Sequence, residues 1–503
     1  MNPENEKDKH SPATDTGATA TTKIDVAYKE NLLDAEQCDE NAEIDKRLNR
    51  KFDLHILPWL FGIWLFSFID RSNIGNAKIA GLPEDLGIAT TGTAFNLVLL
   101  VFYIPYILVD IPSNLILKRV RAGIFLPSLI TAWGLVCTFM GFTKSYAGLI
   151  VCRLLLGMFE GGILGGVIIY LAMFYRRHQM LYRSGLFYCA APLSGAFGGL
   201  LASALGQVTY GGYNRWPWIF FIEGAITVIF GIACFFFMPD TPALAKFLTD
   251  EEKIWALRRM RLDASGSTSI DVDEEKLDWR WAKMALKAPQ TYFCAAIWFF
   301  LLVPLYSFSL FLPSIIRGMK YTSTTAQLFT VPPNMTGFLV VILTAHFSDK
   351  VKQRGVFIIG GTVLGICGYI MLLASDANAV KYAGTFLIAA GVFQGSPMLM
   401  GWLANNLSPH YVRAVGVGVV ISLANCSAFI GTFIYIDRDS PKYVLGHSIS
   451  LGALVMTLIL TCAQIAYLRW ENKKRERGER DDRLLQDDAH LLGDRHPLFR
   501  YTL

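Results

Sequence analysis

The chain has 503 residues, of which 53% are hydrophobic and only 17% are charged. Soluble globular proteins carry roughly 25% charged residues, so this composition argues against a chain of this length with water on all sides. The formal net charge of +5 is too small an excess to indicate a nucleic-acid partner.

The chain begins with a polar segment and continues with a long series of apolar runs. Residues 1–50 are polar, acidic and rich in Thr and Ala, and we expect them to form a disordered cytoplasmic tail. A helix needs about 20 mostly apolar residues to cross a bilayer, and about twelve runs meet this criterion. Six lie within residues 51–238, at 55–77, 93–115, 124–142, 146–172, 184–207 and 217–238, and six lie within residues 291–469, at 291–314, 327–347, 356–374, 381–403, 413–435 and 446–469.

Charged segments between and after these runs define the domain organisation. Residues 239–290 are predicted to be a cytoplasmic linker with an amphipathic helix near 249–262, and residues 470–503 are predicted to be a cytoplasmic tail. Six runs, a linker and six more runs are typical of a transporter built from two repeats. The sequence therefore predicts an all-α membrane protein with twelve transmembrane helices in two six-helix bundles.

Basic residues are concentrated in every second loop. If both termini are cytoplasmic, all the basic clusters lie on the cytoplasmic side, as the positive-inside rule requires. We therefore expect a multi-pass protein of the plasma membrane with both termini in the cytoplasm. The clusters are Arg47, Arg50 and Lys51; Lys118, Arg119 and Arg121; Arg176, Arg177 and Arg183; Lys350, Lys352 and Arg354; and Lys473, Lys474 and Arg475.

Two loops at equivalent places in the two halves, DIPSNLILKRVRAG and HFSDKVKQRG, resemble the paired loops of the major facilitator superfamily. Longer stretches resemble its fungal anion:cation symporter branch, of the allantoate and nicotinate permease type. They are FIDRSNIGNAKIAGL, YIPYILVDIPSNLILKR, RLLLGMFEGGILGGVIIYLAMFYRR, GLFYCAAPLSGAFGGLLA, RWPWIFFIEGAITVIFG, GWLANNLSPHYVRA and LGDRHPLFRYTL. The resemblance extends over nearly the whole chain after residue 50. It implies the major facilitator fold and secondary active transport.

The sequence departs from the family pattern at two places. Asn114 stands where the first-half loop of the superfamily usually has Asp, and Asp110, one turn earlier, is the candidate for that role. The run 413–435 contains NCSAFIG where the branch usually has a Gly-rich stretch. This second departure is expected to alter helix packing in the second half.

Ionisable residues are concentrated in the first and fourth apolar runs, where their cost in a membrane marks them as functional candidates. At 1.5 Å per residue, Asp70 and Arg71 lie about 22 Å along the first run, and Arg153 lies about 10 Å from the opposite end of the fourth. Asp70, Arg71 and Arg153 are therefore expected at a similar depth in the bilayer. Arg153 and Glu160 are seven residues apart and share a helix face, with Gly157 between them. The sequence predicts a ladder of these four charges around a central cavity.

A resemblance to the related animal organic-anion carriers assigns roles to these residues. In that family an Arg of the first span binds the substrate carboxylate and an Arg–Glu pair of the fourth span handles proton coupling. The resemblance therefore implies that Arg71 binds an anion, and that Arg153 and Glu160 couple transport to protons. A guanidinium is suited to the first role, because it stays charged and grips a carboxylate with two parallel hydrogen bonds.

Two further buried carboxylates, Asp70 and Glu223, are candidates for proton coupling. The alternative for Asp70 is a fixed ion pair with Arg71 or Arg153 at the outer gate. The alternative for Glu223 is an ion pair with an arginine of the first or fourth run.

The second half supplies polar and aromatic candidates for substrate binding. Tyr306 and Ser309 lie between two prolines of the seventh run, and Gln394 lies in the tenth. Such groups can stack on and hydrogen-bond a heterocyclic acid such as a pyridine carboxylate. The alternative is hydrogen bonding between helices, which also accounts for Asn406 and Asn425.

The sequence favours proton-coupled import of a small organic anion, such as a carboxylate vitamin or nitrogen source, by alternating access. Its expected partners are that anion, protons and membrane lipids, and it is expected to be a monomer. We predict no enzyme activity, cofactor or metal site, because no Ser/His/Asp arrangement, Cys/His spacing or phosphate-cradling loop occurs at a suitable depth. The alternatives are efflux of a secondary metabolite and a nutrient sensor that keeps the fold.

Overall fold

The computed structural model describes residues 42–88, 92–117, 120–176, 183, 187–205, 208, 214–265, 279–351, 353–408, 410–482, 493–497 and 499–502. The disorder expected for the N-terminal tail therefore falls almost wholly outside the described residues. Within these ranges every regular element is a helix. This is expected for a chain in a bilayer, because a helix satisfies its own backbone hydrogen bonds without water.

Twelve apolar helical segments occupy the positions of the twelve predicted runs. In the described part of the chain, nine are long enough to span a membrane, and three shorter apolar helices, Ala94–Asp110, Ala190–Leu205 and Val415–Gly431, fall on the second, fifth and eleventh runs. The prediction of an all-α membrane protein is confirmed.

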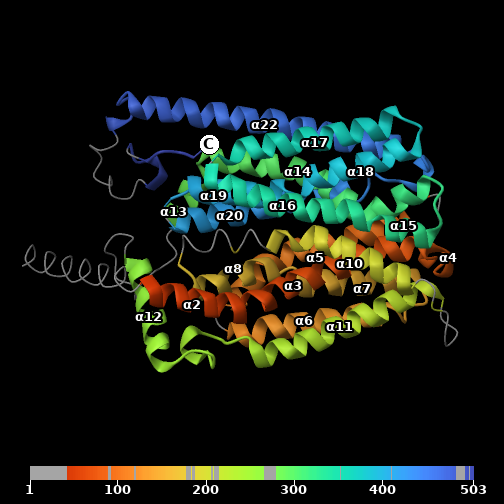
Figure 1. Ribbon diagram of the computed structural model, residues 1–503, viewed down its shortest axis with the longest axis horizontal. Coiled ribbons are helices and arrows are strands. Elements are labelled where there is room, and N and C mark those ends of the chain that lie inside the picture. Colours follow the sequence, from red (N-terminus) through yellow and green to blue (C-terminus); the bar gives the residue numbers. More distant parts are fainter. Residues whose placement is uncertain are drawn as a thin grey trace, which may run out of the picture.

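The helices form two bundles that lie side by side (Figure 1). The first contains α3 (Leu57–Ile79), α5 (Ala94–Leu117), α6 (Ala122–Met140), α7 (Tyr146–Glu160), α8 (Ile163–Phe174), α10 (Ala190–Leu205) and α11 (Arg215–Phe237). The second contains α14 (Pro289–Gly318), α15 (Ser323–Phe329), α16 (Val331–Val351), α17 (Arg354–Ala374), α18 (Asn378–Phe393), α19 (Gly395–Asn406), α20 (His410–Asn425), α21 (Ala428–Gly431) and α22 (Val444–Glu476).

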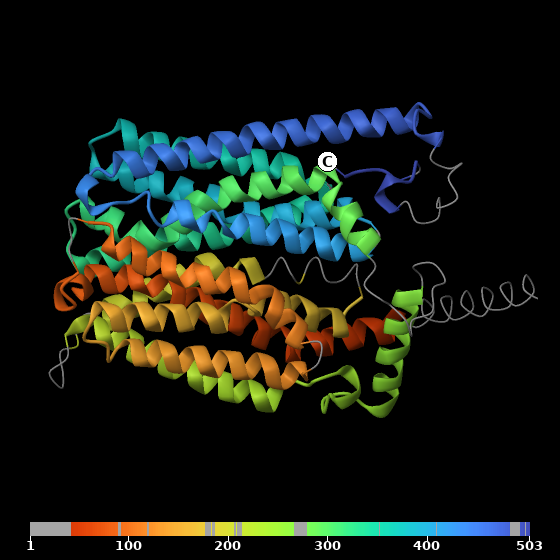
Figure 2. The same cartoon turned by 180° about the vertical axis from the view of Figure 1, so that it is seen from behind.

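Short elements mark the two ends of the molecule, as Figures 1 and 2 show from opposite sides. One end, called here the tail end, carries α2 (Ala42–His55), η1 (Pro242–Leu244), α12 (Asp250–Ser265), α13 (Trp279–Leu286) and η6 (Gly493–Arg495). The other, called the loop end, carries α4 (Leu82–Asp85), α15 and η3 (Asp437–Asp439).

The helix α12 lies where the amphipathic linker helix was predicted and packs against the first bundle. Its Arg259 is fully buried, and donates to Asp45 of α2 (3.1 Å) and to the carbonyl of Phe174 (2.8 Å). Glu252 accepts from Lys51 at 2.6 Å. Burial by itself would raise the pKa of Glu252, but the Lys51 ammonium and the Thr249 N–H hold it below its ordinary value.

Several of the predicted runs, among them the fourth, tenth and eleventh, are built from two helices. The fourth is interrupted at Gly161 and Gly162, directly after Glu160. Both glycines face α5: a Cβ on Gly161 would lie 2.5 Å from the Tyr106 carbonyl oxygen, and one on Gly162 would overlap the Ser113 hydroxyl. The tenth run is interrupted at Gln394 and the eleventh between Asn425 and Ala428. Apolarity alone does not reveal these breaks.

The two bundles are joined at the loop end. Lys78 of α3 forms an ion pair with Asp437 of η3 at 2.6 Å, and Asn96 of α5 donates to the carbonyl of Thr432 at 2.6 Å. The backbones also meet, since a Cβ on Gly75 of α3 would lie 2.2 Å from the Leu310 carbonyl oxygen of α14. The loop end is therefore closed in this conformation.

The approach of α7 to α5 predicts a stability effect. In Gly157→Ala the added Cβ would lie 2.1 Å from the Phe102 carbonyl oxygen, so the helices must separate, and overpacking of this kind costs about 1–3 kcal/mol. We expect a lower thermal unfolding temperature for the purified protein in detergent. The control is Gly360→Ala on α17, where a Cβ meets nothing within 4 Å. Equal unfolding temperatures for the two variants would contradict the packing described here.

Candidate functional site

A cavity of about 50 Å³ lies between the two bundles. Among the described residues that line it, Arg71 of α3 is the only charged one. Seven aromatic side chains from both bundles share the lining: Trp64, Phe68, Tyr106, Tyr188, Trp298, Tyr306 and Phe393. The site is thus a single cation in an aromatic enclosure.

Arg71 forms a buried ion pair with Glu160, the last residue of α7. Its Nε donates to Glu160 Oε1 at 3.1 Å and its Nη2 donates to the same oxygen. Ser67, one turn earlier on α3, donates to that oxygen at 2.5 Å. Only 6% of Arg71 and 1% of Glu160 are exposed. In a low-dielectric site each charge needs the other, because leaving either unpaired costs several kcal/mol.

The aromatic rings contribute to the stability of the guanidinium. Its central carbon lies 4.7 Å from the ring centroid of Tyr106 and 5.0 Å from that of Phe102. Contacts of this kind contribute about 0.5–2 kcal/mol each. The second carboxylate oxygen of Glu160 has no hydrogen-bond partner among the described residues. The pair therefore keeps one acceptor unused next to the cavity.

Arg153 lies apart from this pair. It is buried, and its Nε and Nη2 atoms have no hydrogen-bond partner in the described part of the chain. Glu160 and Asp70 both act on it electrostatically, but the ion pair of Glu160 is with Arg71 on another helix. The two residues of the predicted coupling pair share a helix without a direct contact between their charged groups.

Asp70 and Glu223 point into the first bundle and do not line the cavity. Trp133 Nε1 donates to Asp70 at 3.0 Å and Thr227 Oγ1 donates to it at 3.1 Å. Asn73 donates to Oε2 of Glu223. In the part of the chain that the structure describes, both carboxylates are hydrogen-bonded to neutral partners and neither forms an ion pair with an arginine. Consecutive residues on a helix point about 100° apart, so Asp70 faces α6 and α11 while Arg71 faces the cavity.

Of the substrate-binding candidates in the second half, some line the cavity and others do not. Tyr306 lines the cavity, and its hydroxyl donates to Asn425 at 2.7 Å. Gln394 instead donates to the carbonyl of Phe357 on α17 at 3.0 Å, across from Gly361, whose missing side chain makes room for it. Ser309 is half-buried and, like Gln394, is not part of the lining. The structure does not bring these two to the cavity.

Several lining residues were missed by the sequence analysis. Trp298 donates to the hydroxyl of Ser396 at 3.2 Å, and both residues line the cavity. The ring centroids of Tyr188 and Trp298 are 6.5 Å apart. These residues sit in apolar runs that contain many other aromatic side chains. Nothing in their spacing separates a ring that faces the cavity from one that faces lipid.

The sequence and the fold agree with those of known transporters. The profile of the Major Facilitator Superfamily matches residues 60–467. An uncharacterized transporter of Schizosaccharomyces pombe is 36% identical over 505 residues, covering 100% of this chain and 96% of its own. An MFS-type transporter of Penicillium expansum, cnsO, is 35% identical over 508 residues, covering 97% and 96%.

Solved structures give the same result for the fold. A bacterial homologue of the human lysosomal transporter Spinster, in an inward-facing and unoccupied conformation, superposes with a TM-score of 0.59 at 14% identity, covering 82% of this chain and 96% of that one. The chain belongs to the major facilitator superfamily. It is a multi-pass membrane transporter, and not an enzyme.

The contacts of Asp70 predict that its role is in stability. Asp70→Ala leaves the buried N–H of Trp133 and the hydroxyl of Thr227 without an acceptor, at about 1–3 kcal/mol for each. We expect a clearly lower unfolding temperature in detergent, whereas Asp70→Asn, which keeps an acceptor oxygen, loses less. The matched control is Asp376→Ala, whose side chain is 84% exposed. An unfolding temperature of Asp70→Ala equal to that of the parent would contradict this role.

Proposed function

We propose that this transporter imports a small organic anion across the plasma membrane together with protons. The observation that carries the proposal is the Arg71–Glu160 pair, in which the single cation of the cavity lining is held by one carboxylate of the neighbouring helix. A substrate carboxylate offers the guanidinium the same kind of partner as Glu160 does. Anion binding is then an exchange of one carboxylate for another.

The exchange also accounts for proton coupling. When a substrate carboxylate takes the Nε and Nη2 hydrogen bonds of Arg71, Glu160 loses the cation that stabilises its charge. A carboxylate in a dry cavity without a counterion favours its neutral form, so Glu160 takes up a proton. In the loaded carrier, Arg71 is paired with the substrate carboxylate and Glu160 carries the proton.

The aromatic lining indicates the shape of the substrate. Tyr306, Trp298 and Tyr106 line the cavity, and aromatic side chains of this kind stack favourably on a planar ring. We infer that an aromatic or heteroaromatic carboxylate is preferred over an aliphatic one of the same charge.

The basic clusters support the orientation. Arg50 and Lys51 belong to α2, which lies at the tail end, and α22 carries Lys473, Lys474 and Arg475 in its last turn there. The positive-inside rule favours the cytoplasmic side for this end. The closed loop end, with its Lys78–Asp437 pair, then faces outside. Import requires that this pair opens to admit the anion and forms again behind it.

Substitution of Arg71 tests the anion site. We expect Arg71→Ala to lower the uptake of a carboxylate by about 100-fold or more, because truncating one partner of a buried, hydrogen-bonded charge pair formed on binding costs about 2–5 kcal/mol. Uptake is measured in a transporter-deficient yeast with a panel of nicotinate, allantoate, pantothenate, biotin and related acids, and surface level is checked with a fluorescent tag. Arg71→Lys should keep part of the activity, since it keeps the charge but not the paired hydrogen bonds.

Two further variants separate the loss of binding from the loss of folding. Arg71→Ala combined with Glu160→Gln removes both charges of the pair, so that neither is left buried without the other, and should reach the membrane without restoring uptake. Arg121→Ala removes an arginine whose side chain is 71% exposed, and should transport normally. Parent-like uptake by Arg71→Ala would remove Arg71 from the substrate site.

Glu160→Gln tests the coupling step. We expect this variant to bind and exchange the anion across the membrane but to lose accumulation driven by a pH gradient, because glutamine cannot carry a proton. The matched control is Glu223→Gln, which changes the other buried glutamate of the first bundle and should keep the pH dependence of the parent. If the two variants showed the reverse behaviour, the proton site would be Glu223.

A further inference from the structure

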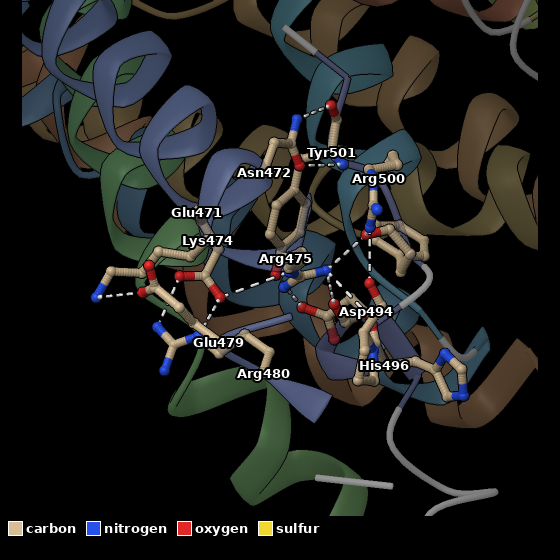
Figure 3. Close-up of polar contacts among 12 residues, drawn as sticks. Glu471, Asn472, Lys474, Arg475, Glu479, Arg480, Asp494, His496, Arg500 and Tyr501 are labelled. Carbon is tan, nitrogen blue, oxygen red and sulfur yellow. Dashed lines mark hydrogen bonds and ion pairs between the residues drawn. The ribbon is translucent and has the colours of Figure 1, made fainter. Parts of the chain in front are cut away.

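The end of the chain folds back onto the tail end of the second bundle. We name the described residues 493–497 and 499–502 the C-terminal strap. Figure 3 shows side chains from α22 and from the strap pointing toward one another. The strap contacts three helices that are far apart in the sequence: α14 at its first turn, α19 at its last turn and α22 near its end. The sequence predicted a cytoplasmic tail here, and the stretch LGDRHPLFRYTL also carried the family resemblance, but its contacts with the helices were not predicted.

Two asparagines hold the backbone of the strap. Asn406 of α19 accepts from the Thr502 N–H at 2.8 Å and donates to the Thr502 carbonyl at 3.0 Å. Asn472 of α22 makes the same pair of bonds with Tyr501, at 3.0 and 2.9 Å. Trp402 of α19 also donates to the Thr502 carbonyl at 2.8 Å. Consecutive strap residues are thus fixed to two different helices.

Arg475 of α22 fastens the other part of the strap. Its Nη1 donates to the carbonyl oxygens of Asp494 and Phe499, each at 2.9 Å, and its guanidinium lies 4.3 Å from the ring centroid of Tyr501. Only 4% of Arg475 is exposed. The strap covers this cation, and its carbonyl oxygens replace the water that the guanidinium would otherwise bind. Glu471 of α22 also pairs with the guanidinium, at 3.5 Å.

Asp494 ties the strap to α14. Gln290, in the first turn of α14, donates to its Oδ2 at 2.6 Å, and the Tyr501 hydroxyl donates to the same oxygen at 3.2 Å. Burial raises the pKa of Asp494, although both of these hydrogen bonds and Arg495 oppose the rise. The strap, α14 and α22 together enclose a cavity of about 350 Å³.

The place of α19 explains why such a tie is needed. The membrane-spanning stretch Asn378–Asn406 is interrupted at Gln394, and the 12 residues of α19 form the part of the span beyond this interruption. Its first turn carries Ser396, which lines the central cavity, and α14 carries Trp298 and Tyr306 of the same lining. Movement of α19 relative to α14 would change the shape of the cavity.

We propose that the C-terminal strap clamps the tail ends of α14, α19 and α22 into one rigid unit, which holds the half-helix α19 in place beside the cavity. The strap is a positioning element, and none of the hydrogen bonds given above for its described residues goes to a residue that lines the central cavity. The proposal does not depend on which solute is carried.

The first test compares thermal unfolding of purified full-length variants in detergent. We expect Asn406→Ala and Arg475→Ala to lower the unfolding temperature by about 2–5 °C. The matched control is Arg500→Ala, since Arg500 is exposed and donates only to carbonyls of the strap itself, those of Pro497 and Phe499. Parent-like unfolding of both Asn406→Ala and Arg475→Ala would overturn the clamp.

The second test separates a local clamp from a general loss of stability. Hydrogen–deuterium exchange is compared between the parent and Asn406→Ala, and between the parent and a chain ending at Asp482. We expect faster exchange in the last turn of α19, around 401–406, with no change at the tail end of α11 in the first bundle. A uniform increase over both bundles, or none in α19, would contradict the proposal. A synthetic peptide of residues 493–503 should slow the exchange of α19 in the shortened chain, and the same peptide with Tyr501→Ala should not.

Discussion

The buried pair of Arg71 and Glu160 is the interaction on which the centre of this transporter depends. A buried guanidinium in a membrane protein is stabilised most strongly by an anion within hydrogen-bond distance, and for Arg71 this anion is Glu160 of α7. The carboxylate lies directly before the break at Gly161 and Gly162, where the missing side chains let α5 approach closely. This approach brings the rings of Phe102 and Tyr106 onto Arg71. The break in the helix and the ion pair thus belong to one arrangement.

The helix α3 divides its polar residues between structure and site. Asp70 and Asn73 point into the first bundle, where they bind Trp133, Thr227 and Glu223, and Arg71 points to the cavity. This division keeps the first bundle rigid while leaving one cation for exchange. The second bundle offers a largely apolar wall and uses the C-terminal strap to hold the broken tenth span.

The general architecture could be predicted from the sequence because the membrane imposes length and apolarity on each span. The same constraint made Arg71, Arg153 and Glu160 visible, since charges in apolar runs are rare. The pairing could not be predicted, because Arg153 shares a helix face with Glu160 while Arg71 reaches it from another helix. Gln394 was misleading for a similar reason, because an amide within a span can bind either a substrate or a backbone carbonyl of a neighbouring helix. The side chain of Gln394 occupies the space beside Gly361 on α17, which the sequence does not reveal.

The most direct test of the exchange between Glu160 and a substrate carboxylate is proton uptake on binding. The purified parent protein is placed in weakly buffered detergent solution with a pH indicator and mixed with an acid that the parent transports, already ionised at the same pH. The account predicts that a proton is taken up from solution with each anion bound, because Glu160 becomes neutral as Arg71 changes partner. Saturable binding without any proton uptake would contradict it.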